Sequence, residues 1–272
     1  MIQLVDLAPS LITLDGLKKY QDKIVGSFEV KKNLVKRKSA PGFSSYNKKG
    51  NKVFDVVKKS LTEMCSGAKR CAYCEDAPAD EVEHIFPKDL FPDLCFVWSN
   101  YLYACGTCNG PKNNKFAIIR HDNQEIVHLD GSIEPPIGQS LLINPRIEDP
   151  LLFCKLNFTS FHFEILHPEN TINYQRADYT INMVLRLNDQ REYLRVAREN
   201  AYGMYMMRLH YYQSYKNSIS DDQKNGMITQ LQKEAHRSVW KEMQRCYIDK
   251  SLWRINRKLF YLFKKNPEAL TW

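Results

Sequence analysis

Two Cys-x2-Cys pairs constrain the fold of this 272-residue chain more than any other feature of its sequence. The first pair is Cys71 and Cys74, and the second is Cys105 and Cys108. A tight Cys-x2-Cys turn brings two thiolates to one ion, and two such turns complete a tetrahedral zinc site. We therefore predict that these four cysteines bind a structural Zn²⁺. A set of reduced thiols or two disulfides are the alternatives, which a metal analysis distinguishes.

The cysteine count of eight favours metal binding or catalysis over disulfides in a cytosolic chain. The first residues have no basic start followed by an apolar core, and no later run approaches the about 18 apolar residues of a membrane span. We therefore expect a cytoplasmic protein without a membrane segment. The four cysteines outside the pairs are expected to be buried small apolar residues: Cys65, Cys95, Cys154 and Cys246.

The polar residues around the second pair suggest chemistry that a closed four-cysteine site cannot perform. Glu83 and His84 are adjacent in the sequence, and Asn109 directly follows the fourth cysteine. A carboxylate can hold a hard divalent ion, and a neutral imidazole can take a proton from water near neutral pH. The amide oxygen of Asn109 would be available to the same ion. Acid–His pairs are common, so it is the position between two cysteine pairs that makes this one informative.

These residues resemble the HNH endonucleases, also called ββα-metal nucleases. That family has an acid–His pair at the end of a β-hairpin, a central Asn in the loop, and a His or Asn opening the next helix; many members add two zinc-binding Cys-x2-Cys pairs. Glu83 and His84, Asn100 and Asn109 match these positions. The resemblance implies that His84 is the general base, that Glu83 and Asn109 bind a catalytic Mg²⁺ or Mn²⁺, and that Asn100 orients the loop carrying His84. Glu replaces the commoner Asp, and Asn replaces the frequent last His.

The charge is unevenly distributed along the chain. Residues 31–70 hold 12 Lys and Arg against 2 Asp and Glu, whereas residues 71–93 hold 1 against 7. Metal ligands between two surfaces that hold a polyanion would give this pattern, although lysine-rich stretches are often only solvated. By the resemblance, Lys112 would contact phosphate. The other predicted nucleic-acid contacts are Lys48, Lys49, Lys88 and Lys115, together with the basic residues Lys31, Lys32, Lys36, Arg37, Lys38, Lys52, Lys58 and Lys59.

A narrower resemblance, over residues 65–200, is to the PtuB proteins, HNH nucleases that work with an ATPase in Septu and some retron antiphage systems. It implies an antiviral defence nuclease with a PtuA-like ATPase partner, which cleaves DNA or, alternatively, RNA such as tRNA. A zinc-stabilised, non-catalytic nucleic-acid-binding or adaptor protein is the competing hypothesis. The resemblance rests on the segments Cys71–Glu75, Glu83–Lys88, Trp98–Asn100, Leu142–Pro145, Asp149–Pro150, Ala177–Ile181 and Leu187–Asn188.

Together, these patterns predict an α+β, mainly helical fold: a ββα-metal HNH core with zinc knuckles, followed by a helical C-terminal region. The expected parts are a basic N-terminal arm at 1–52, the nuclease core at 53–130, a loop-rich connection with short strands at 131–171, and the helical region at 172–272 for partner docking or nucleic-acid binding. Within them, apolar periodicity predicts short helices near 11–20 and 53–64 and later helices at 222–247 and 250–265. Basic and turn-forming residues predict an exposed arm or loop at 31–52. Short strands or helix-end packing are expected near 116–119 and 125–129, and a hairpin or edge strand pair at 156–165.

Overall fold

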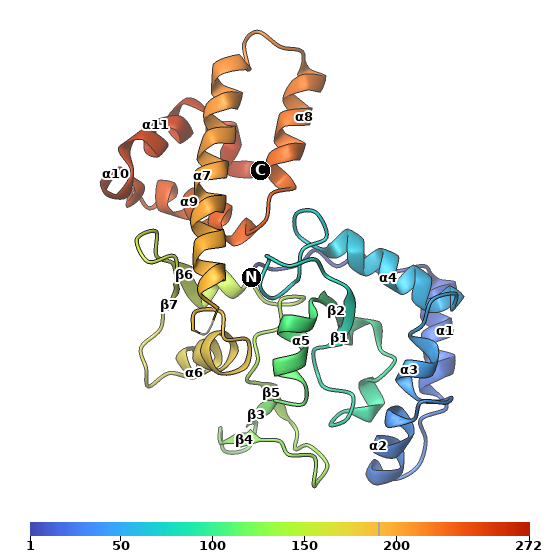
Figure 1. Cartoon of the computed structure of the whole chain (residues 1–272). Coiled ribbons are helices and arrows are strands. Elements are labelled where there is room, and N and C mark those ends of the chain that lie inside the picture. Colours follow the sequence, from blue (N-terminus) through green and yellow to red (C-terminus); the bar gives the residue numbers. More distant parts are fainter. Residues whose placement is uncertain (190) are drawn as a thin grey trace.

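The computed structural model describes residues 1–189 and 191–272, and it combines many helices with small antiparallel sheets (Figure 1). The N-terminal helices and the short strands form one part of the molecule, and the helices from α7 onward form another beside it (Figure 1). No helix in the described ranges is long and apolar enough to cross a membrane.

Four helices precede the first cysteine pair: α1 Leu11–Gln21, α2 Phe28–Lys36, α3 Phe43–Tyr46 and α4 Lys52–Met64. Helix α4 begins where the Asn51 side chain accepts hydrogen bonds from the Val53 and Phe54 amides, which is a standard N-cap. Its apolar face, which includes Phe54 and Leu61, is buried as the helical period predicts. The predicted loop at 31–52 is wrong in part, because α2 and α3 occupy much of it and bury Val35 and Phe43.

A two-stranded hairpin and a short helix form the centre of the fold. Strands β1 Glu81–His84 and β2 Tyr101–Ala104 pair antiparallel, with His84 opposite Tyr101. A long connection joins them and contains two 3₁₀ turns, at Pro92–Leu94 and Trp98–Asn100. Strand β2 leads through Cys105 directly into α5, Gly106–Lys112. The order strand, strand, helix is the one expected around the acid–His pair.

Two further antiparallel sheets follow. The first has the order β4-β3-β5, and the second pairs β6 with β7 as the predicted hairpin at 156–165 requires. Strands β3 and β4 agree with the two strands expected after the cysteine region, whereas β5 lies in the loop-rich connection. The strands are β3 Ala117–Arg120, β4 Ile126–His128, β5 Gly138–Ser140, β6 Cys154–Leu156 and β7 Phe163–Ile165, with a 3₁₀ turn at Pro150–Leu152 before β6.

The C-terminal part is helical, as predicted, but its breaks differ. A single helix was expected at 222–247, whereas the chain forms two helices separated by a turn at 233–236, because His236 adopts a left-handed conformation with φ 54°. Trp240 and Phe263 are fully buried in the core of this part. The elements are α6 Ile172–Asp178, a π-helical turn at Tyr179–Val184, α7 Glu192–Tyr215, α8 Asp221–Gln232, α9 Arg237–Ile248, α10 Leu252–Ile255, α11 Arg257–Lys265 and a final 3₁₀ turn at Pro267–Thr271.

Candidate functional site

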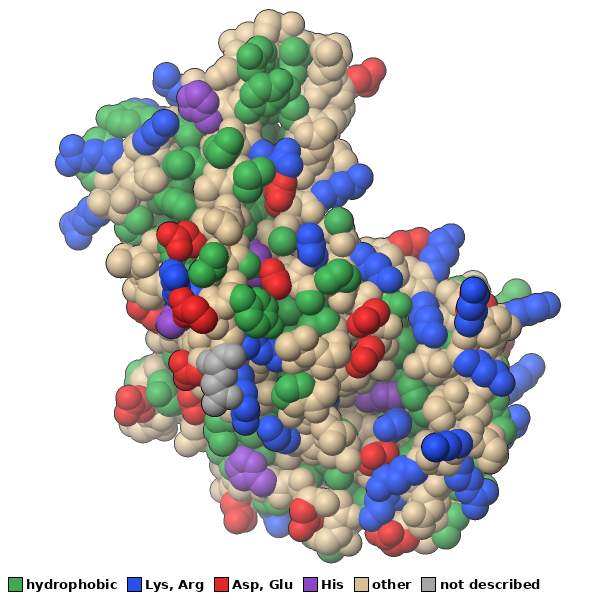
Figure 2. All heavy atoms as spheres, in the orientation of Figure 1, with side chains coloured by type: hydrophobic (Ala, Val, Ile, Leu, Met, Phe, Trp, Pro, Cys, Tyr) green, Lys and Arg blue, Asp and Glu red, His purple; other side chains and the backbone are tan. Residues whose placement is uncertain are grey.

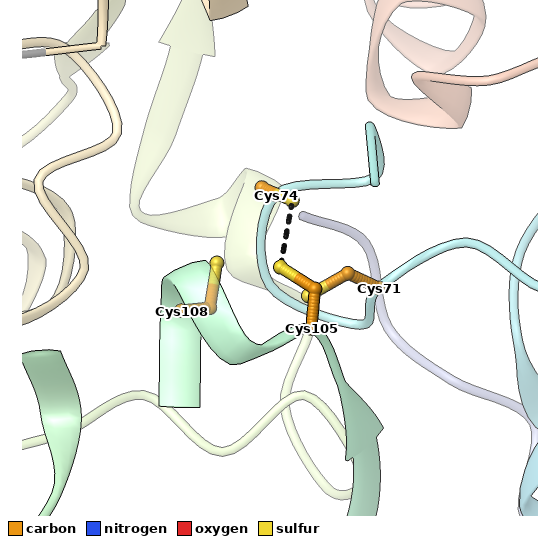
Figure 3. A group of neighbouring side chains, drawn as sticks. All are labelled: Cys71, Cys74, Cys105 and Cys108. Atoms are coloured by element: carbon orange, nitrogen blue, oxygen red, sulfur yellow. Dashed lines mark hydrogen bonds between the residues drawn. The ribbon is translucent and has the colours of Figure 1, made fainter. Parts of the chain in front are cut away.

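The four paired cysteines form one compact cluster (Figure 3). Their sulfur atoms all lie within 4.8 Å of one another, and all four residues are buried. The Cys74 and Cys105 sulfurs are 3.8 Å apart, which matches the edge of about 3.8 Å in a tetrahedron with Zn–S bonds of about 2.3 Å. The cluster can therefore hold a metal such as zinc, and its donor set is the one that structural zinc sites use.

The backbone around the first cysteine pair forms a tight turn that is fixed to the hairpin. The Glu75 amide donates to the Cys71 carbonyl, and Glu75 itself has a positive φ of 61°. The Ala72 amide donates to the carbonyl of Tyr103 in β2. On the other side, the Cys108 amide donates to the Cys105 carbonyl at the start of α5. Both pairs are thus positioned by the same hairpin and helix.

The remaining cysteines are structural. Cys95, Cys154 and Cys246 are buried, as predicted, and burial raises the pKa of the Cys154 and Cys246 thiols to about 12. Cys65 is only half-buried, and its thiol donates to the Leu61 carbonyl one turn earlier in α4. None of these four lies in the metal-binding cluster.

A polar cleft of about 640 Å³ lies next to the cysteine cluster, between β1 and α5. Glu83, His84 and Asn109 all line it, so the fold brings together the three groups that the sequence suggested for chemistry. The other residues that line it are Phe43, Asn47, Lys58, Asp80, Glu81, Val82, Pro87, Lys88, Gly106, Gly110, Asn113 and Asn114.

His84, at the end of β1, is held in one orientation and has only 6% of its surface exposed. Its Nε2 lies 2.9 Å from the Cys95 carbonyl oxygen, which also accepts from the Tyr101 hydroxyl. Since a carbonyl only accepts, Nε2 must carry the proton and Nδ1 the lone pair. The Phe43 ring packs edge-on against the imidazole, with centroids 4.5 Å apart. Burial lowers the pKa of His84 to about 3, against the opposing bond to Cys95.

Glu83 is also buried, and its carboxylate has an internal cation. The Lys112 ammonium in α5 lies 2.5 Å from Glu83 Oε1 and donates to the His84 carbonyl at 2.8 Å. Burial raises the pKa of Glu83, although the ion pair with Lys112 opposes that shift. Lys112 has no exposed surface. The phosphate contact expected of Lys112 therefore has no support in its position, because the ammonium faces inward and binds the strand that carries Glu83 and His84.

Asn109 has a partner that the sequence analysis did not identify. Its side-chain Nδ2 donates to Glu81 Oε2 at 2.7 Å, and both residues line the cleft. A carboxylate only accepts, so this bond fixes the amide and leaves Oδ1 for another ligand. Glu81 lies two residues before Glu83 on β1, and alternate strand residues share a face. That period was the sequence signal for Glu81.

Asn100 ties together the two ends of the connection between β1 and β2. Its Oδ1 accepts from the Phe86 amide at 2.8 Å, and its Nδ2 donates to the Phe86 carbonyl at 2.9 Å and to the Leu94 carbonyl at 3.0 Å. Asn100 is buried, so all three bonds are made away from water. These bonds fix the loop that follows His84, and the resemblance implied that Asn100 would orient this loop.

The basic residues expected to contact nucleic acid lie in different places. Lys88 lines the cleft and pairs with Asp89, and Lys58 of α4 also lines it. Lys48 and Lys49 are exposed between α3 and α4. Lys115 is exposed and lines a separate hollow beside β4 and the π-helical turn. Figure 2 shows Lys and Arg side chains gathered over the N-terminal helices that Figure 1 labels α1 to α4.

Comparison with known proteins gives one informative similarity. The chain is 31% identical over 102 residues to the Septu protein PtuB of Bacillus thuringiensis. The match covers 35% of this chain and 37% of that protein, so it spans little more than a third of either. No protein-family model matches the chain. No solved structure matches it either.

Proposed function

We propose that this chain is a metal-dependent HNH endonuclease that hydrolyses phosphodiester bonds of nucleic acid in antiphage defence. The observation that carries the proposal is that Glu83, His84 and Asn109 line one polar cleft beside the cysteine cluster. The partial similarity to a Septu protein supports the defence role. The four cysteines would hold a structural Zn²⁺ and keep the hairpin and α5 in register.

His84 is the proposed general base. Its Nε2 proton is committed to the Cys95 carbonyl, so Nδ1 is the atom that can accept a proton from the attacking water. Because the pKa of His84 is about 3, the imidazole is neutral throughout the physiological pH range. The three hydrogen bonds of Asn100 keep the following loop, and with it the ring, in place.

Glu83 and the amide oxygen of Asn109 are the proposed ligands of a catalytic Mg²⁺ or Mn²⁺. When bound there, such an ion would stabilise the negative charge that develops on the phosphate. Oxygen donors from a carboxylate and an amide suit these hard cations. Lys112 holds the Glu83 carboxylate against α5, and Glu81 holds the Asn109 amide, so both ligands start from fixed positions.

Substrate capture is assigned to the basic surface around the cleft. Lys58 and Lys88 line the cleft, and Lys48 and Lys49 lie exposed on the same N-terminal part. Such side chains bind the phosphate backbone without reading its sequence. DNA is the proposed substrate, and RNA such as tRNA is the alternative. A PtuA-like ATPase is the proposed partner, and the C-terminal helices are its proposed docking region.

The decisive experiment compares the parent protein with His84→Ala on plasmid DNA and on tRNA, with Mg²⁺ or Mn²⁺ and with the proposed ATPase partner present or absent. Loss of a positioned base should lower the cleavage rate by at least about 100-fold. The exposed His121→Ala variant is the control and should cleave like the parent. Equal cleavage by His84→Ala and the parent would overturn the assigned mechanism.

A non-catalytic nucleic-acid-binding or adaptor protein is the second candidate. It is favoured because the two groups proposed for chemistry already have partners within the protein: Phe43 packs on His84, and Lys112 pairs with Glu83. In that case the purified parent binds nucleic acid with a strong salt dependence but cleaves neither DNA nor RNA, alone or with its partner. The same assay therefore separates the two candidates.

A further inference from the structure

The N-terminal ends of two C-terminal helices rest on the cysteine cluster. Arg191 immediately precedes α7, and its buried guanidinium reaches the second cysteine turn. There Nη1 donates to Cys108 Sγ at 3.2 Å, and Nη2 donates to the Thr107 carbonyl. The Arg191 guanidinium thus contacts one of the four clustered sulfurs directly.

The first cysteine turn, Cys71–Cys74, contacts the start of α9 in a similar way. His236 immediately precedes α9, and its amide donates to the Glu75 carbonyl at 3.3 Å, directly after Cys74. The Ser238 amide donates to Glu75 Oε1 at 3.1 Å, and both side chains are buried. His236 Nε2 lies 3.3 Å from Asp76 Oδ1. Each cysteine turn therefore binds the residue that precedes one helix.

Charge explains why the contact of Arg191 with Cys108 depends on the metal. Four thiolates around one zinc ion keep a net negative charge, and a buried charge is costly unless a partner compensates it. The Arg191 guanidinium supplies that partner, because its Nη1 donates directly to Cys108 Sγ. Without the ion, the two turns lose the ligand that their sulfurs share, and the hydrogen bond from the Ala72 amide to the Tyr103 carbonyl is left to hold the first turn to β2.

We propose that the zinc ion of the four-cysteine cluster fixes the N-terminal ends of α7 and α9 against the core. Through its bond to Cys108, Arg191 links the binding of zinc to the position of α7. Metal loss would then loosen the starts of both helices before it affects distant structure. The coupling is independent of the proposed nuclease activity, because none of the residues that make it lines the cleft.

The test measures amide hydrogen exchange of the full chain with zinc bound and after its removal by a chelator, with metal content checked in each sample. Removal is expected to speed exchange at 191–200 and 234–242 while the β3–β4–β5 sheet at 117–140 keeps its protection. Unchanged exchange at the helix starts overturns the proposal. An equal increase along the whole chain also overturns it, because it would show general stabilisation only.

Arg191→Gln tests the coupling residue with the metal present. Loss of a partner to a metal ligand should speed zinc release about tenfold, and the thiolate-to-metal charge-transfer band of the Co²⁺-substituted protein should move to lower energy. Arg195→Gln is the matched control, since Arg195 lies on α7 and its ion-pair partners among the described residues are Glu192 and Glu199. If Arg191→Gln does not fold, Arg191→Lys serves instead, with intermediate release expected. Zinc release and a Co²⁺ spectrum like those of the control overturn Arg191 as the coupling residue.

Discussion

The cysteine cluster and the polar cleft are neighbours on α5, yet they are built in opposite ways. Cys108 belongs to the cluster, and the next residue, Asn109, lines the cleft. The cluster offers four buried sulfurs and is closed to further ligands. The cleft offers oxygen and nitrogen donors on a surface that stays open to a large molecule. Glu83 and His84 are buried like the cysteines, so it is the donor type and the open cleft beside them that separate a site that holds structure from one that can act on a substrate.

This contrast predicts that replacing cysteines of the cluster mainly lowers the free energy of unfolding. Replacing both Cys105 and Cys108 with serine should abolish zinc binding, whose free energy in structural sites is about 10 kcal/mol or more. That free energy is large compared with the stability of a typical domain, so we expect the region around the cluster to unfold at a much lower denaturant concentration while the β3–β4–β5 sheet keeps its structure. Metal analysis and denaturant unfolding measure it.

Cys65→Ser is the control for this prediction, because Cys65 lies outside the cluster and a serine can keep the bond to the Leu61 carbonyl. It should change stability by less than about 1 kcal/mol. Full zinc content and unchanged unfolding in the Cys105 and Cys108 double variant would show that the cluster is not a structural metal site.

Lys112 tests the border between the two regions, since it lies on α5 but pairs with Glu83 of the cleft. Lys112→Met should destabilise the protein by about 3–5 kcal/mol, because it leaves a buried carboxylate without its cation. Adding Glu83→Gln should restore much of that loss. Chemical unfolding of the single and double variants measures both effects. Unchanged stability with weakened nucleic-acid binding would instead favour the phosphate contact that the sequence suggested.

Glu81 tests the open site alone and should give the smallest effect. Glu81→Ala removes one exposed hydrogen bond to Asn109, so Mn²⁺ affinity in the cleft should fall by about threefold to tenfold, with little change in unfolding. Calorimetric titration of the zinc-loaded protein with Mn²⁺ measures it. Asp80→Ala, which removes another acid that lines the cleft, is the control. Equal losses in both variants would mean that charge, and not the orientation of Asn109, sets the affinity.

The cysteine cluster and the helix-rich character could be predicted because both depend on short-range patterns. Spacing alone identified Cys71, Cys74, Cys105 and Cys108 as one ligand set, and they do lie within 4.8 Å of one another. Apolar periodicity likewise located α4, since its buried residues recur on one helical face. These signals need only a few neighbouring residues to be read.

What could not be predicted depends on contacts between distant segments. The resemblance implied a phosphate contact for Lys112, and nothing local in the sequence shows that its ammonium meets Glu83 and the His84 carbonyl instead. Helices α2 and α3 were missed because they lie in a basic segment with few apolar residues. One of these apolar residues, Phe43, packs on His84. The break before α9 depends on the left-handed backbone of His236, a conformation that non-glycine residues seldom adopt and that the apolar period of the segment does not show.

The adjacency of Cys108 and Asn109 also limits how this chain can evolve. Successive residues on a helix point about 100° apart, so adding or deleting one residue in α5 would turn either the sulfur or the amide away from its site. Substitutions around α5 can be tolerated, whereas insertions or deletions within it cannot. Homologues that keep both sites should therefore show no insertions between the second cysteine pair and Lys112, even where the surrounding loops vary freely.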